Sequence, residues 1–296
     1  MSTYLNAYTL IEDIRRGVNE FSDAYVQGTD TTGIYSNAHL TRCLNRSQRY
    51  MYAIQMNYIP GEFLTSTSLT GVNSVYTLPW DFGSLREFKD ENGRKVFKSS
   101  ISAIPTTGAV GSKRYYYRKG NTLVLNRSGI TDTYTLYYFT KPRDLHHSQG
   151  GSNCAATALH MDTTDAKTID DYYNGMTVEN RTQDLTEAIT DYTGSTKIAV
   201  VASTPADDDW YGLVPEIPEI FHHLIAPRAI MIAKAEHPVA PKPPNKDEIE
   251  MWRNEVRDAL IAFGYDSDIT PEDIWLGFGS GAGMGDTIPG QGYTIY

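Results

Sequence analysis

The stretch from Ser74 to Lys141 constrains the fold more than any other part of the chain, because it reads as a series of short β-strands. It opens with Val75–Trp80, where larger and smaller side chains alternate with the period of two that places neighbours on opposite faces of a sheet. Pro79 has no N–H group to donate and therefore ends this strand at a turn. Short runs rich in Tyr, Phe, Val or Leu follow, namely Leu85–Phe88, Lys95–Lys98, Lys113–Arg118, Thr122–Leu125 and Thr133–Thr140. The pattern predicts an antiparallel meander.

Two dipeptides in this stretch predict tight hairpin turns. Asn92-Gly93 offers the two positive-φ positions that a type I′ turn requires, and Gly120-Asn121 plays a similar part between two strand-forming runs. We therefore expect an antiparallel β domain over residues 62–145.

Two helices are predicted before this block. From Thr3 to Gln27, apolar residues recur at three- and four-residue steps while charged residues fill most of the other face, which is typical of an amphipathic helix. Ser36 can cap a second helix that ends at Pro60-Gly61. We expect these two helices to pack antiparallel because they are closely connected.

Two more helices are predicted near the C-terminus. The first runs from Glu219 to about Glu236, and Pro227 within it should produce a kink or a break. The second begins with a capping box at Asn245, whose partner glutamate stands three residues later. The most economical packing joins both helix pairs into one bundle, formed by residues 1–61 and 215–265.

A second β-rich unit is predicted over residues 146–214. Its start, His146 to Ala156, lacks apolar residues and is interpreted as a linker. Asn174-Gly175 and Tyr192–Ser195 then mark turns between strands that alternate polar and apolar side chains. The complete prediction is an α+β fold, in which a helical bundle carries a central antiparallel β domain and an inserted small β-module.

Residues 266–296 are predicted to form an extended arm without a fold of its own. Glycines alternate from Gly277 to Gly285, so regular structure would be costly there. The segment nevertheless carries large apolar and aromatic side chains, which a solvated tail has little reason to display, so we expect it to order against another subunit or a partner. The predicted partner-binding residues are Trp275, Phe278, Ile288, Tyr293, Ile295 and Tyr296.

Composition excludes several classes of function. The 36 acidic residues outnumber the 26 basic ones and give a formal net charge of −10, so a broad attractive surface for nucleic acid or anionic lipid is not expected. Cys43 and Cys154 are too few for a secreted disulfide scaffold and are predicted to be reduced thiols. There is no recognisable export signal and no window near about 18 consecutive apolar residues, so we expect a protein of the cytosol with no membrane partner.

No motif predicts catalysis, a cofactor or a bound metal ion. His146-His147 and His222-His223 lack zinc-like ligand spacing and are interpreted as linker and helix-surface histidines. The carboxylates within Asp162–Asp171 and Asp207–Asp209 do not fit an EF-hand loop, and solvated turns explain them better. Lys113–Lys119 interleaves basic and aromatic residues as a nucleic-acid face does, but strand alternation also explains its tyrosines.

Two sequence signatures resemble known protein families. The run Tyr76–Phe82, followed by a Gly-turned sheet that contains Tyr117–Leu123, is similar to the head-to-tail adaptor (connector or neck) proteins of tailed bacteriophages over roughly residues 1–145. The pattern Tyr-x-Gly-Met-x-Val at Tyr173–Val178 resembles a small β-module of phage virion proteins, which implies no chemistry.

The adaptor resemblance implies a non-enzymatic structural virion protein that forms a ring between the portal protein and the tail or nozzle proteins. It further implies twelve copies in the ring, a lumen through which DNA passes without specific binding, and a C-terminal arm that reaches the portal. The protein is then expected in the neck of the virion, and in the host cytoplasm during assembly.

An alternative is a tail-associated binding module, in which the inserted β-unit recognises a glycan or another virion protein. This function would need an exposed aromatic platform, while an enzyme would need a converging polar site. Candidates for the platform are Tyr172, Tyr173, Tyr192, Trp210 and Tyr211. The 21 tyrosines of the chain favour an assembly protein, because tyrosine suits surfaces that are both wet and buried in partners.

Overall fold

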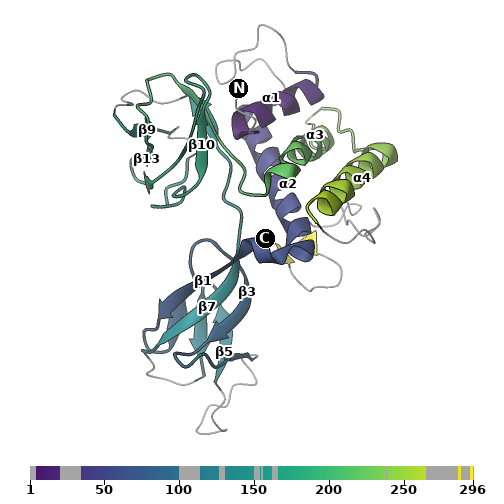
Figure 1. Ribbon diagram of the computed structural model, residues 1–296. Helices are drawn as coiled ribbons and strands as arrows, with labels where there is room; N and C mark the ends of the chain where they lie inside the picture. The colour runs from purple at the N-terminus through teal and green to yellow at the C-terminus, as the bar shows by residue number, and fades with distance from the viewer. Residues whose placement is uncertain are drawn as a thin grey trace. The chain divides into compact units, whose positions relative to one another are not determined.

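The computed structural model describes residues 5–20, 35–99, 114–126, 131–149, 154, 156–161, 166–237, 239–264, 286–287 and 294–295. The chain divides into two compact units, one formed by residues 1–58 with 143–296 and the other by residues 59–142. It is an α+β protein with helices and antiparallel sheets, as predicted (Figure 1). The four predicted domain ranges divide the chain more finely than these two units and stay predictions.

The unit of residues 59–142 begins with a short 3₁₀ helix, η1 (Pro60–Phe63), and continues as two sheets with strand orders β1-β7-β3 and β2-β6-β5-β4. The predicted strand-forming runs all form strands, although a meander is the wrong topology. The last strand, β7, lies between β1 and β3, and β4 pairs with β5 in parallel. The strands are β1 (Leu64–Thr70), β2 (Val75–Thr77), β3 (Phe82–Lys89), β4 (Phe97–Lys98), β5 (Tyr115–Lys119), β6 (Thr122–Leu125) and β7 (Thr133–Thr140).

An aromatic core fills the space between these two sheets. The rings of Tyr76 and Tyr134 meet edge to face with their centroids 5.0 Å apart, and the Tyr76 hydroxyl donates to the carbonyl oxygen of Asp132 at 3.0 Å. A Cβ atom at Gly71 would lie 2.4 Å from the Tyr76 ring, so this position accepts only glycine without a shift of the core. The core comprises Tyr76, Leu78, Phe82, Phe88, Val96, Tyr116, Leu123, Leu125, Tyr134, Leu136 and Tyr138.

The two hairpin turns differ from the type I′ prediction. At Asn92-Gly93 only the glycine has a positive φ, of 75°. The Asp90 carboxylate accepts hydrogen bonds from the backbone N–H groups of Asn92 (3.0 Å) and Arg94 (2.8 Å), and this side-chain contact shapes the turn. Gly120 has a φ of 57° and Asn121 has no positive φ, which matches a type II′ turn.

The other unit contains all four α-helices of the described chain; two of them begin with a predicted cap, at Ser36 and Asn245, and a third begins with a cap at Asn6 that was not predicted. Asn6 and Asn245 form capping boxes with Thr9 and Glu248, and the Ser36 hydroxyl accepts from the N–H of His39 at 3.2 Å. The helices are α1 (Ala7–Gly17), α2 (Asn37–Tyr58), α3 (Ile225–Ala235) and α4 (Lys246–Ala262).

The predicted first helix is too long, and the predicted third helix is broken. The first ends at Gly17, because Asn19 adopts a φ of 61° and the N–H of Glu20 bonds to the carbonyl oxygen of Arg15 at 2.9 Å. Ahead of α3 the chain forms a 3₁₀ helix, η3 (Glu219–Leu224). Pro227 lies in the first turn of α3, where its missing N–H costs little, so the expected break falls just before it.

The helices of this unit pack through their apolar stripes. Helices α1, α2 and α3 contact one another, and α4 contacts η3 (Figure 1). Trp252 of α4 is buried and donates its indole N–H to the carbonyl oxygen of Leu224 at 3.0 Å. The N- and C-terminal helices therefore share contacts, as expected.

Two small sheets follow α2 in the same unit, with strand orders β11-β10-β14-β8 and β12-β13-β9. The predicted linker from His146 is wrong at its start, because His146 is buried and residues 147–149 form a strand that pairs with β14. The strands are β8 (His147–Gln149), β9 (Ala158–His160), β10 (Thr177–Asn180), β11 (Leu185–Ala188), β12 (Asp191–Thr193), β13 (Ile198–Val200) and β14 (Trp210–Leu213).

Buried polar contacts fix the first of these sheets to α1. Asn6, the N-cap of α1, donates from Nδ2 to Oε2 of Glu179 in β10 at 2.6 Å, and both side chains are fully buried. Strand β14 passes so close that a Cβ atom at Gly212 would lie 2.6 Å from the Asn6 amide oxygen. The sheet and the helix N-terminus are therefore held together by direct contact.

Candidate functional site

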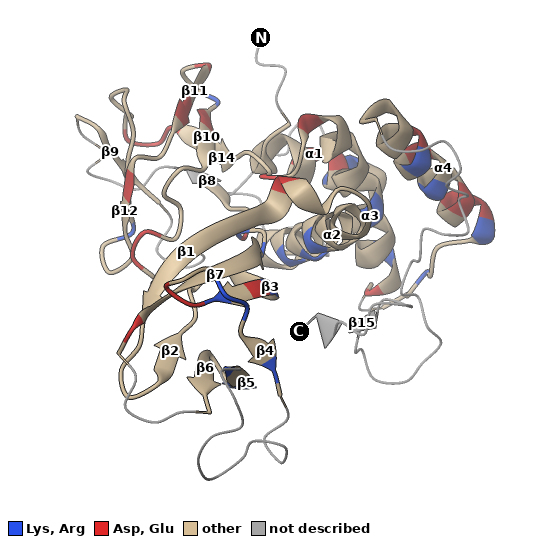
Figure 2. Cartoon of the chain, turned by 60° about the horizontal axis from the view of Figure 1, so that its bottom comes forward, with Lys and Arg blue, Asp and Glu red and all other residues tan. Residues whose placement is uncertain are grey.

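Helix α2 carries a row of arginines and no acidic residue. Arg42, Arg46 and Arg49 stand at positions i, i+4 and i+7 and therefore share one helix face, here called the arginine stripe. Figure 2 shows the basic positions along α2. In a chain with a net charge of −10 this is a local reversal of sign. Sequence reasoning missed it, because the apolar spacing of this helix was considered and the arginine spacing was not.

The segment that follows β7 is fastened to α2 beside this stripe. Asn45 donates from Nδ2 to the carbonyl oxygen of Leu145 at 3.0 Å and accepts from the Leu145 N–H at 2.6 Å. Gln48 donates to the carbonyl oxygen of Arg143 at 2.7 Å. These bonds replace the backbone partners that a strand would provide, and they hold Asp144 at the helix surface.

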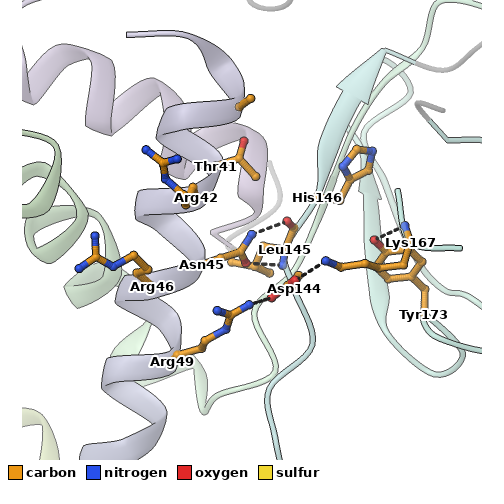
Figure 3. A pocket seen from close by; sticks show the side chains of 11 residues that line it. Thr41, Arg42, Asn45, Arg46, Arg49, Asp144, Leu145, His146, Lys167 and Tyr173 are labelled. Atoms are coloured by element: carbon orange, nitrogen blue, oxygen red, sulfur yellow. Dashed lines mark hydrogen bonds and ion pairs between the residues drawn. The ribbon is translucent and has the colours of Figure 1, made fainter. Parts of the chain in front are cut away.

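A pocket of about 210 Å³ lies between α2 and this segment (Figure 3). One wall is α2 with the arginine stripe, and the facing wall includes Lys167 and Tyr173. Asp144 lies between the walls, where it pairs with Arg49 and accepts from Nζ of Lys167 at 2.6 Å.

The pocket has more positive than negative charge. Three arginines and Lys167 share two carboxylates: Asp144 pairs with Arg49 and Lys167, and Glu236 pairs with Arg46 and lies 3.8 Å from Arg42. Among the described residues, four positive charges against two negative ones give an excess of two positive charges. Guanidinium groups arranged in this way are suited to a carboxylate or another oxyanion.

The surrounding cations stabilise the ionised form of Asp144. Burial raises the pKa of this carboxyl, but the hydrogen bond from Lys167 and the charge of Arg49 outweigh that effect, so its pKa lies below the ordinary value. The pKa of Asp144 is lower in the folded chain than in the unfolded chain, where that of an aspartate is about 3.9. Its charge therefore stabilises the fold at pH values above about 3.9, and this stabilisation is lost as the pH falls through the pKa of the folded state.

We expect the substitution Asp144→Asn to lower the free energy of unfolding by about 1–3 kcal/mol at pH 7, because it removes the charge that pairs with Arg49 and Lys167. The difference between the variant and the wild type should shrink as pH falls below about 4. Urea unfolding at several pH values measures it. A difference that is constant from pH 7 to pH 3 would contradict the proposed charge pairing.

A second cluster beside the stripe brings three metal-ligand types together. His39 and Cys43 of α2 and Glu236 have ligand atoms within 4.8 Å of one another. Arginines, however, occupy the Glu236 carboxylate, and Arg42 contacts Nδ1 of His39 at 2.7 Å. Because a guanidinium only donates, Nδ1 must accept, and the ring proton then sits on Nε2, the atom that would bind the metal. The cluster is therefore interpreted as a hydrogen-bonded network.

The same network should make Cys43 unreactive. Its side chain is fully buried, and burial together with the Glu236 charge raises the pKa of the thiol to about 12. Cys154 is half-buried, and Cys43 and Cys154 form no disulfide. We expect a maleimide at pH 7.5 to label Cys154 in the folded protein and Cys43 only after unfolding, as read by mass spectrometry of peptides. Rapid labelling of native Cys43 would contradict the packing of α2 described above.

The described residues include only one of the sequence-predicted arm residues. Trp275, Phe278, Ile288, Tyr293 and Tyr296 lie outside the described residues. Ile295 is placed by its backbone only, in β16 (Thr294–Ile295), which pairs antiparallel with β15 (Asp286–Thr287). Their role in partner binding stays a prediction.

The aromatic platform of the alternative hypothesis is contradicted. Four of its five candidates, Tyr172, Tyr173, Tyr192 and Tyr211, are buried, and only Trp210 is partly accessible. Their hydroxyl groups make structural bonds; that of Tyr192, for example, donates to the carbonyl oxygen of Lys167 at 2.5 Å. These rings belong to the core of the β-strands and cannot present a flat binding surface.

The histidine interpretation is also corrected. His146 and His222 are buried, the former 3.1 Å from the Tyr211 hydroxyl and the latter 2.7 Å from the carbonyl oxygen of Ile217. His147 is buried as well, whereas His223 is exposed. Three of the four are therefore core residues, which sequence reasoning had placed in a linker or on a surface.

Two further residues considered for nucleic-acid or cation binding, Arg114 and Asp209, make contacts within the fold. Arg114 pairs with Glu91 at 3.2 Å and bonds to the hydroxyl of Tyr134, so it is already engaged within its own sheet region. Asp209 is buried, not solvated, and accepts from Asn180 at 2.9 Å and Gln183 at 2.7 Å. Lys113, Asp162 and Asp165 lie outside the described residues.

Comparison with known proteins identifies the class. The family model described as SU10 adaptor protein matches residues 5–176, more than half of the chain, and this region includes every residue that lines the pocket. The chain therefore belongs to the SU10 adaptor protein family, and its predicted relation to phage head-to-tail adaptors is confirmed. No curated protein matches the sequence. Among the described residues, no helix is both long and apolar enough to cross a membrane.

Proposed function

We propose that this protein is the head-to-tail adaptor of a tailed bacteriophage, forming a ring between the portal and the tail through which DNA passes. The observation that carries the proposal is the family match over residues 5–176. Because the match covers α1, α2 and the sheets of residues 59–142, the part of the chain that precedes β10 carries the adaptor signature. The ring has twelve copies, as the family resemblance implies.

The helices supply the ring wall in this proposal. The contacts among α1, α2 and α3, together with the contact between α4 and η3, support one bundle built from both ends of the chain. Such a bundle offers different surfaces on its two sides, and identical subunits close into a ring when different surfaces meet with the correct rotation. In this proposal the two β-units, residues 62–145 and 146–214, face the portal or the tail.

The net charge of −10 suits a protein that DNA passes without binding. An acidic lumen repels the phosphate backbone, and this repulsion keeps the DNA from adhering during packaging and ejection. The protein has no catalytic role and no cofactor in this proposal, and it works in the neck of the virion after assembly in the host cytoplasm.

The arm of residues 266–296 ties each subunit to the portal. A tether adds affinity to each contact, and repetition around a ring multiplies that gain. A chain that ends at Tyr265 should therefore keep its helices and sheets but bind portal rings more weakly than the full chain. Equal binding by both chains would remove the arm from the proposal.

The function is tested by making phage particles without this protein. Head-to-tail adaptors complete the neck, so we expect DNA-filled heads that lack tails and lose DNA on storage, and addition of purified protein should restore tail attachment. Electron microscopy of the particles gives the readout. Normal tailed particles in the absence of the protein would overturn the proposal.

A further inference from the structure

The arginine stripe is accessible and has an excess of positive charge. The side chains of Arg42, Arg46 and Arg49 are 63%, 36% and 45% exposed, and Lys167 across the pocket is 38% exposed. Among the described residues, these four cations share two carboxylates, which is an excess of two positive charges. A surface of this kind selects an acidic ligand.

Helix α4 carries the opposite charge on its outer face. Asp247, Glu250, Glu255 and Asp258 are all exposed, and their spacing places them within one helix face. Two cations pair with this face, Lys246 with Glu250 at 3.5 Å and Arg257 with Asp258 at 2.8 Å. Four negative charges against two positive ones leave an excess of two negative charges. The surface formed by these four acidic residues is here called the acidic face. Figure 2 shows acidic and basic positions along α4.

The acidic face also has the apolar content of a contact surface. Met251 lies in the middle of it and is 60% exposed, whereas Trp252 and Val256 on the other side of α4 are buried in the helix core. A large exposed apolar side chain ringed by charges is typical of the centre of a protein contact. Arg42 and Arg46 can pair with carboxylates here while their own stems cover apolar surface.

The pocket fits an acidic side chain better than it fits DNA. Duplex DNA presents its phosphates on a broad convex rod, whereas this site is a recess of about 210 Å³ with the Asp144 carboxylate inside it. A DNA backbone reaching the stripe would also approach Glu236. A partner helix can instead present single carboxylates to the exposed guanidinium groups, so a protein partner is favoured.

We propose that the arginine stripe and Lys167 of one copy bind the acidic face of α4 in a second copy. The charges are complementary, an excess of two positive against an excess of two negative. Stripe and face lie on different helices of the same subunit, so the contact is heterologous and each subunit offers one surface to each neighbour. This inference rests on the proposed ring and names the subunit contact that builds it.

The test is a charge swap within one chain. Variant one is Arg42→Glu, chosen because Arg42 is the most exposed of the stripe and its ion pair with Glu236, at 3.8 Å, is looser than those of Arg46 and Arg49. Variant two is Glu255→Arg with Asp258→Arg, both exposed on α4. Each should weaken self-association by about tenfold or more, and the combined chain should recover part of it because the carboxylate introduced at position 42 can then pair with the arginines introduced on α4. The matched control, Arg94→Glu in an exposed turn of the other unit, should have no effect.

Sedimentation velocity at low and at physiological salt measures self-association, circular dichroism checks the fold of each variant, and a separate pull-down measures binding to portal rings. If the wild type assembles on the portal but the variants assemble equally well, the contact is overturned and the proposed function stands. If the wild type neither self-associates nor binds the portal, both fail. Binding of duplex DNA that is lost in Arg42→Glu would assign the stripe to nucleic acid and overturn the inference.

Discussion

The variant Trp252→Ala should unfold with a free energy about 3–5 kcal/mol lower than the wild type, the usual cost of removing a buried tryptophan. Trp252 is almost completely buried, and its indole N–H bonds to the carbonyl oxygen of Leu224 at 3.0 Å. Arg228 lies over the same ring at 5.6 Å, so the variant also loses a cation–π contact. The side chain links α4 to η3 and thereby to the rest of the helices.

Trp252→Phe is the matched comparison, because it keeps one aromatic ring in the core and removes the indole N–H together with part of the buried ring. We expect it to cost less than Trp252→Ala but at least about 1–2 kcal/mol, the value of one buried hydrogen bond. Urea unfolding followed by circular dichroism measures both variants. A Trp252→Ala variant as stable as the wild type would show that α4 does not pack as described.

The variant Asn45→Ala should lose about 2–4 kcal/mol of stability. The amide of Asn45 makes two bonds to Leu145, one from Nδ2 to the carbonyl oxygen at 3.0 Å and one from the Leu145 N–H to Oδ1 at 2.6 Å. Leu145 is buried, so its two backbone groups would be left without these partners. Asn45→Asp is the comparison variant: it keeps the acceptor for the Leu145 N–H but places a second oxygen against the Leu145 carbonyl oxygen, so it should also lower stability.

The Asn45 variant also tests the position of the pocket. Asp144 is held at the surface of α2 by the bonds on either side of it, from Asn45 and Gln48. When one of these is removed, Asp144 should pair less well with Arg49, and the pH dependence of stability below about pH 4 should weaken. An Asn45→Ala variant with unchanged stability and unchanged pH dependence would contradict this role.

Local signals were predicted well, because they depend on residues close in the chain. Thr122–Leu125 and Thr133–Thr140 form β6 and β7 with the expected bounds, and the caps at Ser36 and Asn245 were read from single residues. The α+β class followed from these signals alone.

Contacts between distant residues could not be predicted, because nothing in the local pattern specifies them. β7 inserts between β1 and β3 although it follows both in sequence. Asn6 meets Glu179 across 173 residues, and Asn45 meets Leu145 across 100. Such pairings decide which polar residues are buried, which is why His146, Tyr173 and Asp209 were expected in the wrong environment.

Only part of the candidate site could be predicted from the sequence. The spacing of Arg42, Arg46 and Arg49 was visible, but its importance depends on Asp144 and Lys167 across the pocket. The predicted arm residues remain a proposal that rests on their apolar character in a Gly-rich segment.

The measurement that tests the adaptor role most directly is the mass of the complex between the full-length protein and purified portal rings. Native mass spectrometry resolves additions of one 33.1 kDa subunit. We expect a closed set of added subunits, twelve by family resemblance, with few partly filled rings because neighbouring copies stabilise one another. A monomer that leaves the mass of the portal ring unchanged would contradict the adaptor role.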